Sequence, residues 1–254
     1  VGDVDAIFCR SGMISAAVIE AAPRLKIVSR HGVGYDNVDV DACSRSGVLV
    51  TTTGEANSQS VSELAFGLIL ALARDLVRAN AEMDAGRWQR GGLVGTELYG
   101  KTLGIVGLGR VGRRLARHAA GFDLEVLACD PYLDAATVAK RGARQVDLPT
   151  LLAQADFVSL HLPLNTETRH LIDAAALAQM KETAFLVNAA RGGLVDEAAL
   201  YTALTQKQIA GAALDVFDQE PLPGGHPLVG LDTVCHTPHI AGQSAESLMR
   251  MSVQ

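Results

Sequence analysis

Side chains able to do chemistry follow several short apolar runs in the second half of the chain. Arg191 follows AFLVNAA, Asp215 lies near the end of IAGAALDVF, and two histidines, His236 and His239, stand in TVCHTPHIAGQS. A histidine has an ordinary pKa of about 6.5, so it can exchange a proton with a substrate near neutral pH. An arginine can bind a carboxylate and polarise a carbonyl. These residue types suit proton transfer to a small organic acid.

A glycine-rich segment adds a second kind of chemistry. GLGRVG, residues 107–112, fits G-x-G-x-x-G, follows an apolar run, opens a helical pattern and is followed by Asp130 at the end of the next apolar run. Gly107 permits a tight turn, Gly109 lets the backbone approach a pyrophosphate, and Gly112 allows close packing of helix on strand. Asp130 can accept hydrogen bonds from both ribose hydroxyls and would repel a 2′-phosphate. We therefore predict NAD rather than NADP as the cofactor, and this context disfavours a glycine turn without a ligand.

The elements that must position these residues alternate from Gly100 onward. The predicted strands are residues 102–109, 124–130, 156–163, 184–190, 209–217 and 233–238, with helices near 110–122, 135–141, 174–180 and 197–205. Buried strands separated by helices indicate a parallel, doubly wound sheet, and ligands bind such sheets outside the carboxyl ends of the strands. We expect Arg191, Asp215 and His239 to meet at one crevice, although each could be structural, Arg191 as a helix-cap partner and Asp215 as a turn former.

The first part of the chain predicts a smaller α/β unit, followed by one long helix over residues 58–85. Ser58 or Ser60 is the expected N-cap of this helix. Its apolar face is wide, and we interpret it as an arm between two domains and a candidate subunit contact. The predicted fold class is α/β: a doubly wound Rossmann nucleotide domain plus a smaller, flavodoxin-like α/β domain that is discontinuous in sequence.

Composition and charge exclude several classes of partner. The 254 residues carry a net charge of -6 and no run of Lys and Arg, which argues against nucleic acid. The longest apolar stretch, residues 64–73, is too short to span a bilayer, so no membrane partner is expected. The four cysteines have no C-x-x-C spacing and no signal peptide is visible, which predicts reduced thiols and a cytoplasmic protein. No metal-binding motif is present.

Several motifs resemble, in order and spacing, those of the D-isomer-specific 2-hydroxyacid dehydrogenases. They are LGIVGLGRVG, HLPLNTETRHLI, FLVNAARGGLVDEAAL, GAALDVFDQEP and TPHIAG, and LKIVSRHGVGYDNVD resembles the substrate-domain loop of that family. The resemblance covers nearly the whole chain, and phosphoglycerate, glyoxylate and hydroxypyruvate reductases look nearest. It implies an NAD-dependent oxidoreductase that interconverts a small D-2-hydroxy acid and its 2-keto acid, and a homodimer.

The resemblance also implies roles for single residues. Arg191, Glu220 and His239 occupy the positions of the family's catalytic trio. In those roles His239 donates a proton to the carbonyl oxygen, Glu220 favours and orients the imidazolium, and Arg191 grips the substrate. For His236 we expect only a packing contact or a local hydrogen bond. Without the resemblance, Glu220 would be interpreted as a solvated turn residue in DQEPLP.

Binding residues follow from the same resemblance. The substrate carboxylate is expected on the backbone N–H groups of Val33 and Gly34 in HGVGYDN, besides Arg191 and His239. Asp215 is expected on the nicotinamide side. The full set of expected cofactor contacts is Gly107, Leu108, Gly109, Arg110, Val111, Gly112, Asp130, Leu162, Ala189, Ala190, Asp215, Ala241 and Gly242.

The expected domain division follows the family as well. Residues 1–54 with residues 240–254 form the substrate domain, and residues 55–239, including the arm helix, form the NAD-binding domain. The chain begins with Val1 and ends in LMRMSVQ. We therefore expect the substrate domain to be incomplete at both ends, with its final helix absent or cut short.

Two alternatives stay open at this point. One is a catalytically weak, NAD(H)-sensing binding protein of the same fold, like the family's corepressors, which keep a similar trio. The lack of extra tails or basic patches argues against it. The other is a formate dehydrogenase, in which glutamine typically stands where this chain has Glu220. The particular 2-hydroxy acid does not follow from the sequence.

Overall fold

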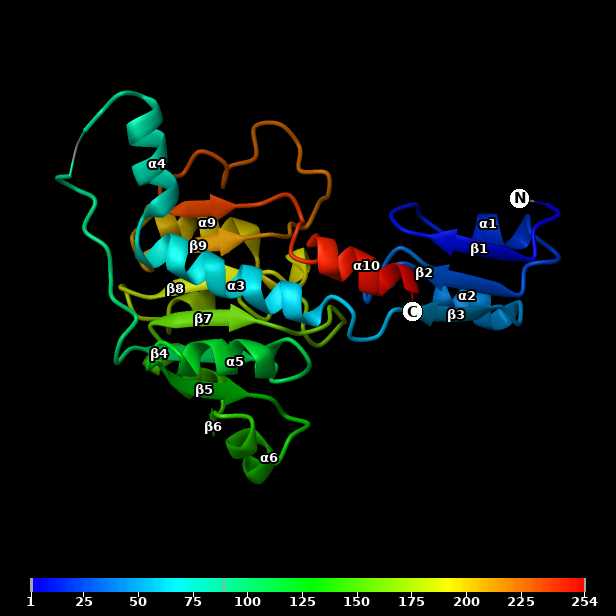
Figure 1. The fold of residues 1–254 in the computed structure, drawn as a ribbon, viewed down its shortest axis with the longest axis horizontal. Helices are drawn as coiled ribbons and strands as arrows, with labels where there is room; N and C mark the ends of the chain where they lie inside the picture. Colours follow the sequence, from blue (N-terminus) through cyan, green and yellow to red (C-terminus); the bar gives the residue numbers. More distant parts are fainter. Residues whose placement is uncertain (1, 89, 254) are drawn as a thin grey trace. The chain divides into compact units, whose positions relative to one another are not determined.

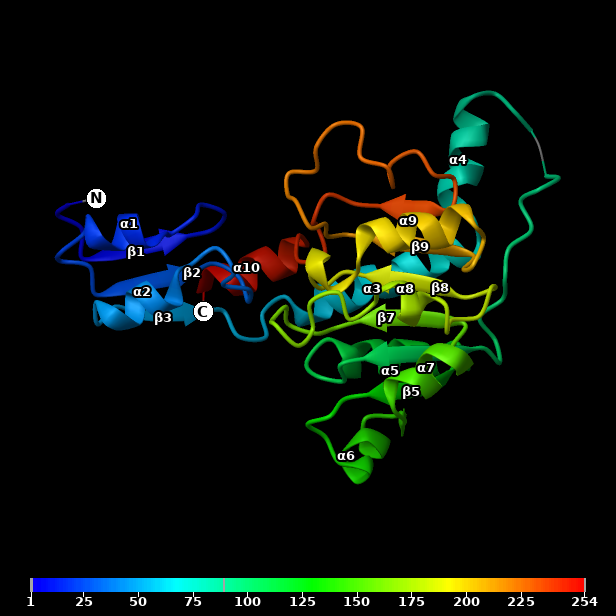
Figure 2. The same cartoon turned by 180° about the vertical axis from the view of Figure 1, so that it is seen from behind.

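The chain divides into two compact units. A computed structural model describes residues 2–88 and 90–253 (Figure 1 and Figure 2). The smaller unit comprises Val1–Ser60 with Gly242–Gln254, and the larger unit comprises Val61–Ala241. The assignment of the two units as substrate and NAD-binding domains stays a prediction.

The smaller unit is built on a parallel sheet in the order β1-β2-β3. Its strands are β1 (Ala6–Cys9), β2 (Ile27–Arg30) and β3 (Leu49–Thr52), and its helices are α1 (Ala16–Glu20), α2 (Val40–Arg45) and α10 (Ala245–Val253). Ile19, Val28 and Cys43 lie in its buried core. Arg250 Nε donates from α10 to the carbonyl of Ala56 at 2.8 Å. The expectation that this domain is incomplete at both ends, with its final helix absent or cut short, stays a prediction.

The larger unit contains a parallel sheet in the order β10-β9-β8-β7-β4-β5-β6. The strands are β4 (Thr102–Val106), β5 (Glu125–Cys129), β6 (Arg144–Gln145), β7 (Phe157–Leu160), β8 (Phe185–Asn188), β9 (Gly211–Leu214) and β10 (Val234–His236). The chain runs from β4 outward to β6 and then from β7 outward to β10, so the winding direction reverses between β4 and β7. This topology confirms the predicted doubly wound α/β class. Strand β6 was not predicted, because two residues give no readable periodicity.

Helices cover both faces of the large sheet. They are α3 (Ser58–Ala73), α5 (Gly112–Ala120), α6 (Ala135–Lys140), α7 (Leu148–Gln154), α8 (Ala174–Leu177), the 3-10 helix η1 (Gly192–Leu194) and α9 (Glu197–Thr205). A further helix, α4 (Leu76–Asp84), has no buried residue among those that the structure describes. Helices α3 and α5 lie in front of the sheet in Figure 1, and α7, α8 and α9 lie in front of it in Figure 2. Each group packs an apolar side against the sheet, which gives one buried cluster on each face. Throughout the described ranges, no helix is long and apolar enough to cross a bilayer.

The prediction of one long helix over residues 58–85 is wrong. Helix α3 ends at Ala73 and α4 begins at Leu76, because Asp75 adopts a left-handed backbone with φ of 52°. The carbonyl of Ala73 accepts a hydrogen bond from Thr96 N at 2.6 Å instead of continuing the helical ladder. A segment distant in sequence therefore ends α3, which helical periodicity alone does not reveal.

Candidate active site

The glycine turn after β4 has steric requirements at two of its three glycines. Gly107 has a φ of 91°, and a Cβ there would lie 2.6 Å from the carbonyl oxygen of His161. A Cβ at Gly112, the first residue of α5, would lie 2.2 Å from the carbonyl oxygen of Gly107. Gly109 differs, since a Cβ there would meet no atom within 4 Å. Gly107 and Gly112 are therefore needed to build the turn, and Gly109 leaves the surface of the turn open.

Asp130 stands beside this turn, just beyond the end of β5. Its Oδ2 accepts from Leu108 N at 3.0 Å, and its Oδ1 accepts from Tyr132 N at 3.0 Å. Arg141 Nη1 donates to the carbonyl of Leu108 at 2.5 Å and holds the same turn from the other side. Each carboxylate oxygen can accept more than one hydrogen bond, so Asp130 keeps capacity for ribose hydroxyls. An open glycine turn at a helix N-terminus with an adjacent carboxylate fits a dinucleotide.

His239 and Glu220 form a direct pair at the ends of the later strands. His239 Nδ1 lies 2.6 Å from Glu220 Oε2, and Glu220 Oε1 accepts from Phe217 N at 3.0 Å. The His239 side chain is 51% exposed, so the ring is open to a ligand. The bond at Nδ1 orients the ring and leaves Nε2 for that ligand.

The pair is biased toward imidazolium and carboxylate. The hydrogen bond to Glu220 raises the pKa of His239 above its ordinary value, against the opposing effects of burial and of the Arg191 charge. Burial raises the pKa of the Glu220 carboxyl, but the bonds from His239 and Phe217 outweigh it, and that pKa lies below its ordinary value. The positive charge of Arg191 lowers the pKa of both groups. The structure pairs Glu220 with His239 directly, and the residue after Arg191, Gly192, packs on the peptide between Phe217 and Asp218.

Asp215 fixes the loop that carries His239. Its carboxylate has no solvent exposure; Oδ1 accepts from Thr237 Oγ1 at 2.5 Å and from Ile240 N at 2.8 Å, and Oδ2 accepts from Ala241 N at 2.9 Å. A buried carboxylate needs such bonds to offset its lost hydration. His239 has a left-handed φ of 53° and donates its backbone N–H to the carbonyl of Asp215 at 2.8 Å. Such a backbone is held in place by its surroundings and is common at functional sites.

Arg191 is positioned by the end of β8. Asn188, which is 1% exposed, donates from Nδ2 to the carbonyl of Arg191 at 2.7 Å and accepts from Ala190 N at 3.1 Å. Asn188 is a site residue that was not predicted, although its place at a strand end before ARGG was the available signal. A Cβ at Gly192 would lie 2.0 Å from the carbonyl carbon of Phe217. The turn that follows Arg191, called here the arginine turn, therefore packs directly on the segment that leads to Glu220.

The other expected residues fall into three groups. Leu162 packs beside Gly107, since its Cδ2 would lie 2.8 Å from a Cβ at that glycine. Ala189 and Ala241 are buried and Ala190 is half-buried, while the turn's Arg110 is exposed and Val111 is half-buried. Val33, Gly34 and Gly242 belong to the smaller unit. The binding roles expected for all of these residues, and for Asp215, stay predictions.

The remaining histidines at strand ends differ from His239. His236 is the last residue of β10 and is exposed. His161 follows β7, and its Nε2 lies 2.9 Å from Ser159 Oγ. Burial lowers the pKa of His161 to about 4, so this histidine is neutral near pH 7. Unlike His161, His239 is biased toward the protonated form needed for proton donation.

Comparison with known proteins agrees with this geometry. Residues 66–241 match the family model described as "D-isomer specific 2-hydroxyacid dehydrogenase, NAD binding domain". The chain belongs to the D-isomer-specific 2-hydroxyacid dehydrogenase family. NAD is accordingly the cofactor of the larger unit, whose glycine turn and Asp130 fit it.

Individual relatives cover nearly all of the chain. It is 44% identical to D-3-phosphoglycerate dehydrogenase of Methanocaldococcus jannaschii over 96% of this chain and 47% of that protein. It is 44% identical to glyoxylate reductase of Korarchaeum cryptofilum over 94% of this chain and 73% of that protein. The crystal structure of D-lactate dehydrogenase from Aquifex aeolicus complexed with NAD and lactic acid matches with a TM-score of 0.89 and 31% identity, over 98% of this chain and 80% of that one. The chain thus spans about half the length of the phosphoglycerate dehydrogenases that it matches.

Proposed function

We propose that this protein is an NAD-dependent oxidoreductase that interconverts a small D-2-hydroxy acid and its 2-keto acid. The observation that carries the proposal is the direct His239–Glu220 pair, reached by a segment on which the turn after Arg191 packs. These residues follow β8, β9 and β10, and the glycine turn follows β4, so all of them lie at the carboxyl edge of one parallel sheet. A proton donor, an anion-binding cation and a cofactor turn at one edge are what this reaction requires.

In the proposed reaction each of the three catalytic residues has its own role. NAD, when bound, supplies or accepts the hydride. In the reductive direction His239 donates the proton on Nε2 to the carbonyl oxygen, and in the oxidative direction it takes that proton back. Glu220 holds the proton on Nδ1 and stabilises the charged ring. Arg191 binds the substrate's carboxylate and polarises its carbonyl.

The choice between the two nicotinamide cofactors rests on Asp130. Its carboxylate lies within hydrogen-bond distance of the glycine turn, at Leu108 N. A negative charge at this place accepts from ribose hydroxyls and repels a 2′-phosphate. We infer a preference for NAD(H) over NADP(H).

The oligomeric state and the compartment are part of the proposal. The family resemblance favours a homodimer in the cytoplasm, without nucleic acid or membrane as a partner. Free thiols at Cys9, Cys43, Cys129 and Cys235 agree with a reducing compartment. Light scattering of the purified chain tests the dimer, since a monomer mass at micromolar concentration would contradict it.

The experiment that tests the proposed function is the loss of NADH absorbance with a panel of 2-keto acids. The panel contains glyoxylate, hydroxypyruvate, pyruvate and phosphohydroxypyruvate, and each acid is repeated with NADPH. Turnover of at least one acid, faster with NADH than with NADPH, is the expected result and identifies the substrate group. Binding of NADH without turnover of any acid would contradict the assigned activity.

A further inference from the structure

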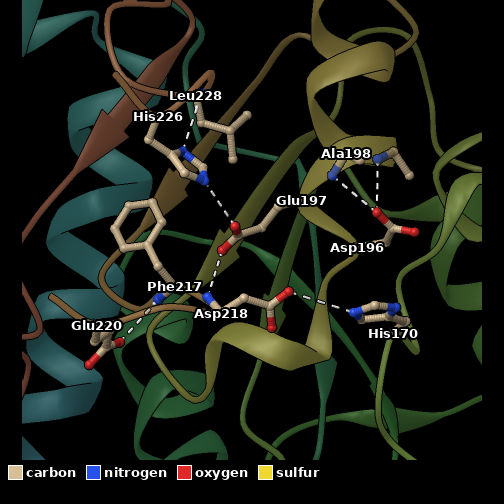
Figure 3. A network of polar contacts seen from close by, with 10 residues as sticks. His170, Asp196, Glu197, Ala198, Phe217, Asp218, Glu220, His226 and Leu228 are labelled. Carbon is tan, nitrogen blue, oxygen red and sulfur yellow. Dashed lines mark hydrogen bonds and ion pairs between the residues drawn. The ribbon is translucent and has the colours of Figure 1, made fainter. Parts of the chain in front are cut away.

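The loop that carries Glu220 is held mainly through its backbone. It follows β9, and Asp218, Gln219 and Glu220 are all exposed. Two consecutive N–H groups fix its first residues: Phe217 N donates to Glu220 at 3.0 Å, and Asp218 N donates to Glu197 Oε1 at 2.7 Å (Figure 3). The Glu197 carboxylate therefore anchors the peptide next to the one that holds Glu220.

Glu197 is itself held by a histidine. Its Oε2 lies 3.0 Å from His226 Nε2, and the two side chains are only 16% and 14% exposed. Leu228 N points at His226 Nδ1 from 3.4 Å, which makes Nδ1 the acceptor and leaves the proton on Nε2 for Glu197. The His226 ring also contacts the Phe217 ring edge-on, with centroids 5.8 Å apart. Both oxygens of Glu197 are thus engaged between the Glu220 loop and His226, as Figure 3 shows.

Capping of α9 does not account for this arrangement. Asp196 is the N-cap, and its Oδ1 accepts from Ala198 N and from Ala199 N, each at 3.0 Å. Glu197 is the first residue of α9, where any carboxylate gains from the helix dipole. A purely structural role for Glu197 would therefore change the stability of the protein, and would leave the chemistry of a distant histidine unchanged.

The same peptide also contacts the turn that follows Arg191. A Cβ at Gly192 would lie 2.1 Å from the carbonyl oxygen of Phe217 and 2.5 Å from Asp218 N. The peptide that donates to Glu197 therefore rests on the backbone of Gly192. Movement of this peptide would shift the Glu220 loop relative to the arginine turn.

We propose that Glu197 and His226 form a positioning pair for Glu220. The pair fixes the peptide behind Glu220 and so keeps Glu220 Oε2 within hydrogen-bond distance of His239. This inference rests on the proposed function, in which His239 is the proton donor. Neither Glu197 nor His226 touches the substrate in this scheme; both act through Glu220.

The titration midpoint of His239 distinguishes a positioning role of Glu197 from a merely structural one, because loss of a structural contact alone would leave that midpoint unchanged. The charged groups that act on it are Glu220 and Asp215, which favour its protonated form, and Arg191, which opposes it. The two oxygens of Glu197 bond Asp218 N and His226 Nε2 and neither bonds His239, so we expect the removal of Glu197 to reach His239 through a displaced Glu220. If Glu220 moves away, the titration midpoint of His239 falls.

The test is a histidine NMR titration of the full chain, with the His239 signal assigned from His239→Asn. The variants are Glu197→Ala, which removes the anchor, and His226→Phe, which keeps an aromatic ring beside Phe217 but removes the nitrogens that bond Glu197 and Leu228 N. The matched control is Asp218→Asn, which changes the side chain facing His170 at 3.7 Å but keeps the backbone N–H that donates to Glu197. NADH affinity and 2-keto acid turnover are measured on the same samples.

We expect Glu197→Ala to lower the midpoint of His239 and to reduce kcat about tenfold, since small displacements of catalytic groups have effects of this order. NADH affinity stays within twofold of wild type, and Asp218→Asn leaves the midpoint unchanged. His226→Phe lowers the midpoint by a smaller amount and decides the question if Glu197→Ala does not fold. An unchanged midpoint in the folded variants overturns the positioning role. A lowered midpoint in a protein that turns over no 2-keto acid would instead retain the positioning role and reject the proposed function.

Discussion

A substitution at Gly109, the middle glycine of the cofactor turn, should weaken cofactor binding without weakening the fold. A methyl group added at Gly109 meets no atom within 4 Å, and the backbone there does not have a positive φ. Gly109→Ala should therefore leave the free energy of unfolding unchanged or raise it by up to about 1 kcal/mol. The same methyl group would occupy the space through which a pyrophosphate approaches the turn. Loss of one hydrogen bond to a charged group costs about 1.5–3 kcal/mol, so the Kd for NADH should rise roughly 10- to 100-fold.

Gly112→Ala is the matched control for Gly109→Ala. Its Cβ would lie 2.2 Å from the carbonyl oxygen of Gly107, so the helix must move away from the strand. Overpacking of this kind costs about 1–3 kcal/mol, and the unfolding midpoint should fall. The assay is a thermal melt of the apo protein and a fluorescence titration with NADH for both variants. Wild-type NADH affinity in Gly109→Ala would refute the assignment of this turn as the cofactor site.

Three further substitutions test the catalytic pair, the cofactor preference and the loop. Glu220→Gln removes the main group that raises the pKa of His239, so the basic limb of the pH profile of kcat/KM for reduction should move to lower pH. Turnover at pH 8 should then fall about tenfold, the equivalent of about 1.4 kcal/mol. A pH profile with an unchanged basic limb would contradict this role. Asp130→Asn removes a repulsion of about 1 kcal/mol between the carboxylate and a 2′-phosphate. The ratio of kcat/KM with NADH to kcat/KM with NADPH should therefore fall about fivefold. An unchanged ratio would show that Asp130 does not set the cofactor preference. Asp215→Asn turns an amide N–H₂ toward backbone donors such as Ala241 N and should lower stability by about 1–3 kcal/mol in a denaturant melt, which an unchanged midpoint would disprove.

Much of the fold and the site follows from sequence patterns. Short apolar runs that end in Gly107, Arg191 and Asp215 predict parallel strands, and parallel strands bring their carboxyl ends to one edge. That geometry alone predicts that Arg191 and His239 lie near each other. In the structure Arg191 follows β8 and His239 follows β10, with β9 between these two strands in the sheet. The pairing of Glu220 with His239 was expected only from the family resemblance, because Glu220 lies in an exposed loop without periodicity.

Features that depend on contacts between distant segments were not predicted. Helix α3 ends where Asp75 adopts a left-handed backbone and where Thr96 N, from a segment distant in sequence, donates to the carbonyl of Ala73. The bonds from Asp215 to the loop behind His239 join residues from two strand ends. Glu197 lies in a helix and His226 in a loop, so their pairing appears only in three dimensions.

The central claim is that His239 supplies the proton in reduction of a 2-keto acid by NADH. Its most direct test is the rate of NADH oxidation by His239→Ala, with the 2-keto acid that the wild-type protein reduces fastest. The account predicts a loss of about 100- to 10,000-fold in kcat, the usual contribution of a general acid, with the Kd for NADH unchanged. Wild-type turnover in His239→Ala would contradict the account and assign the proton to another group.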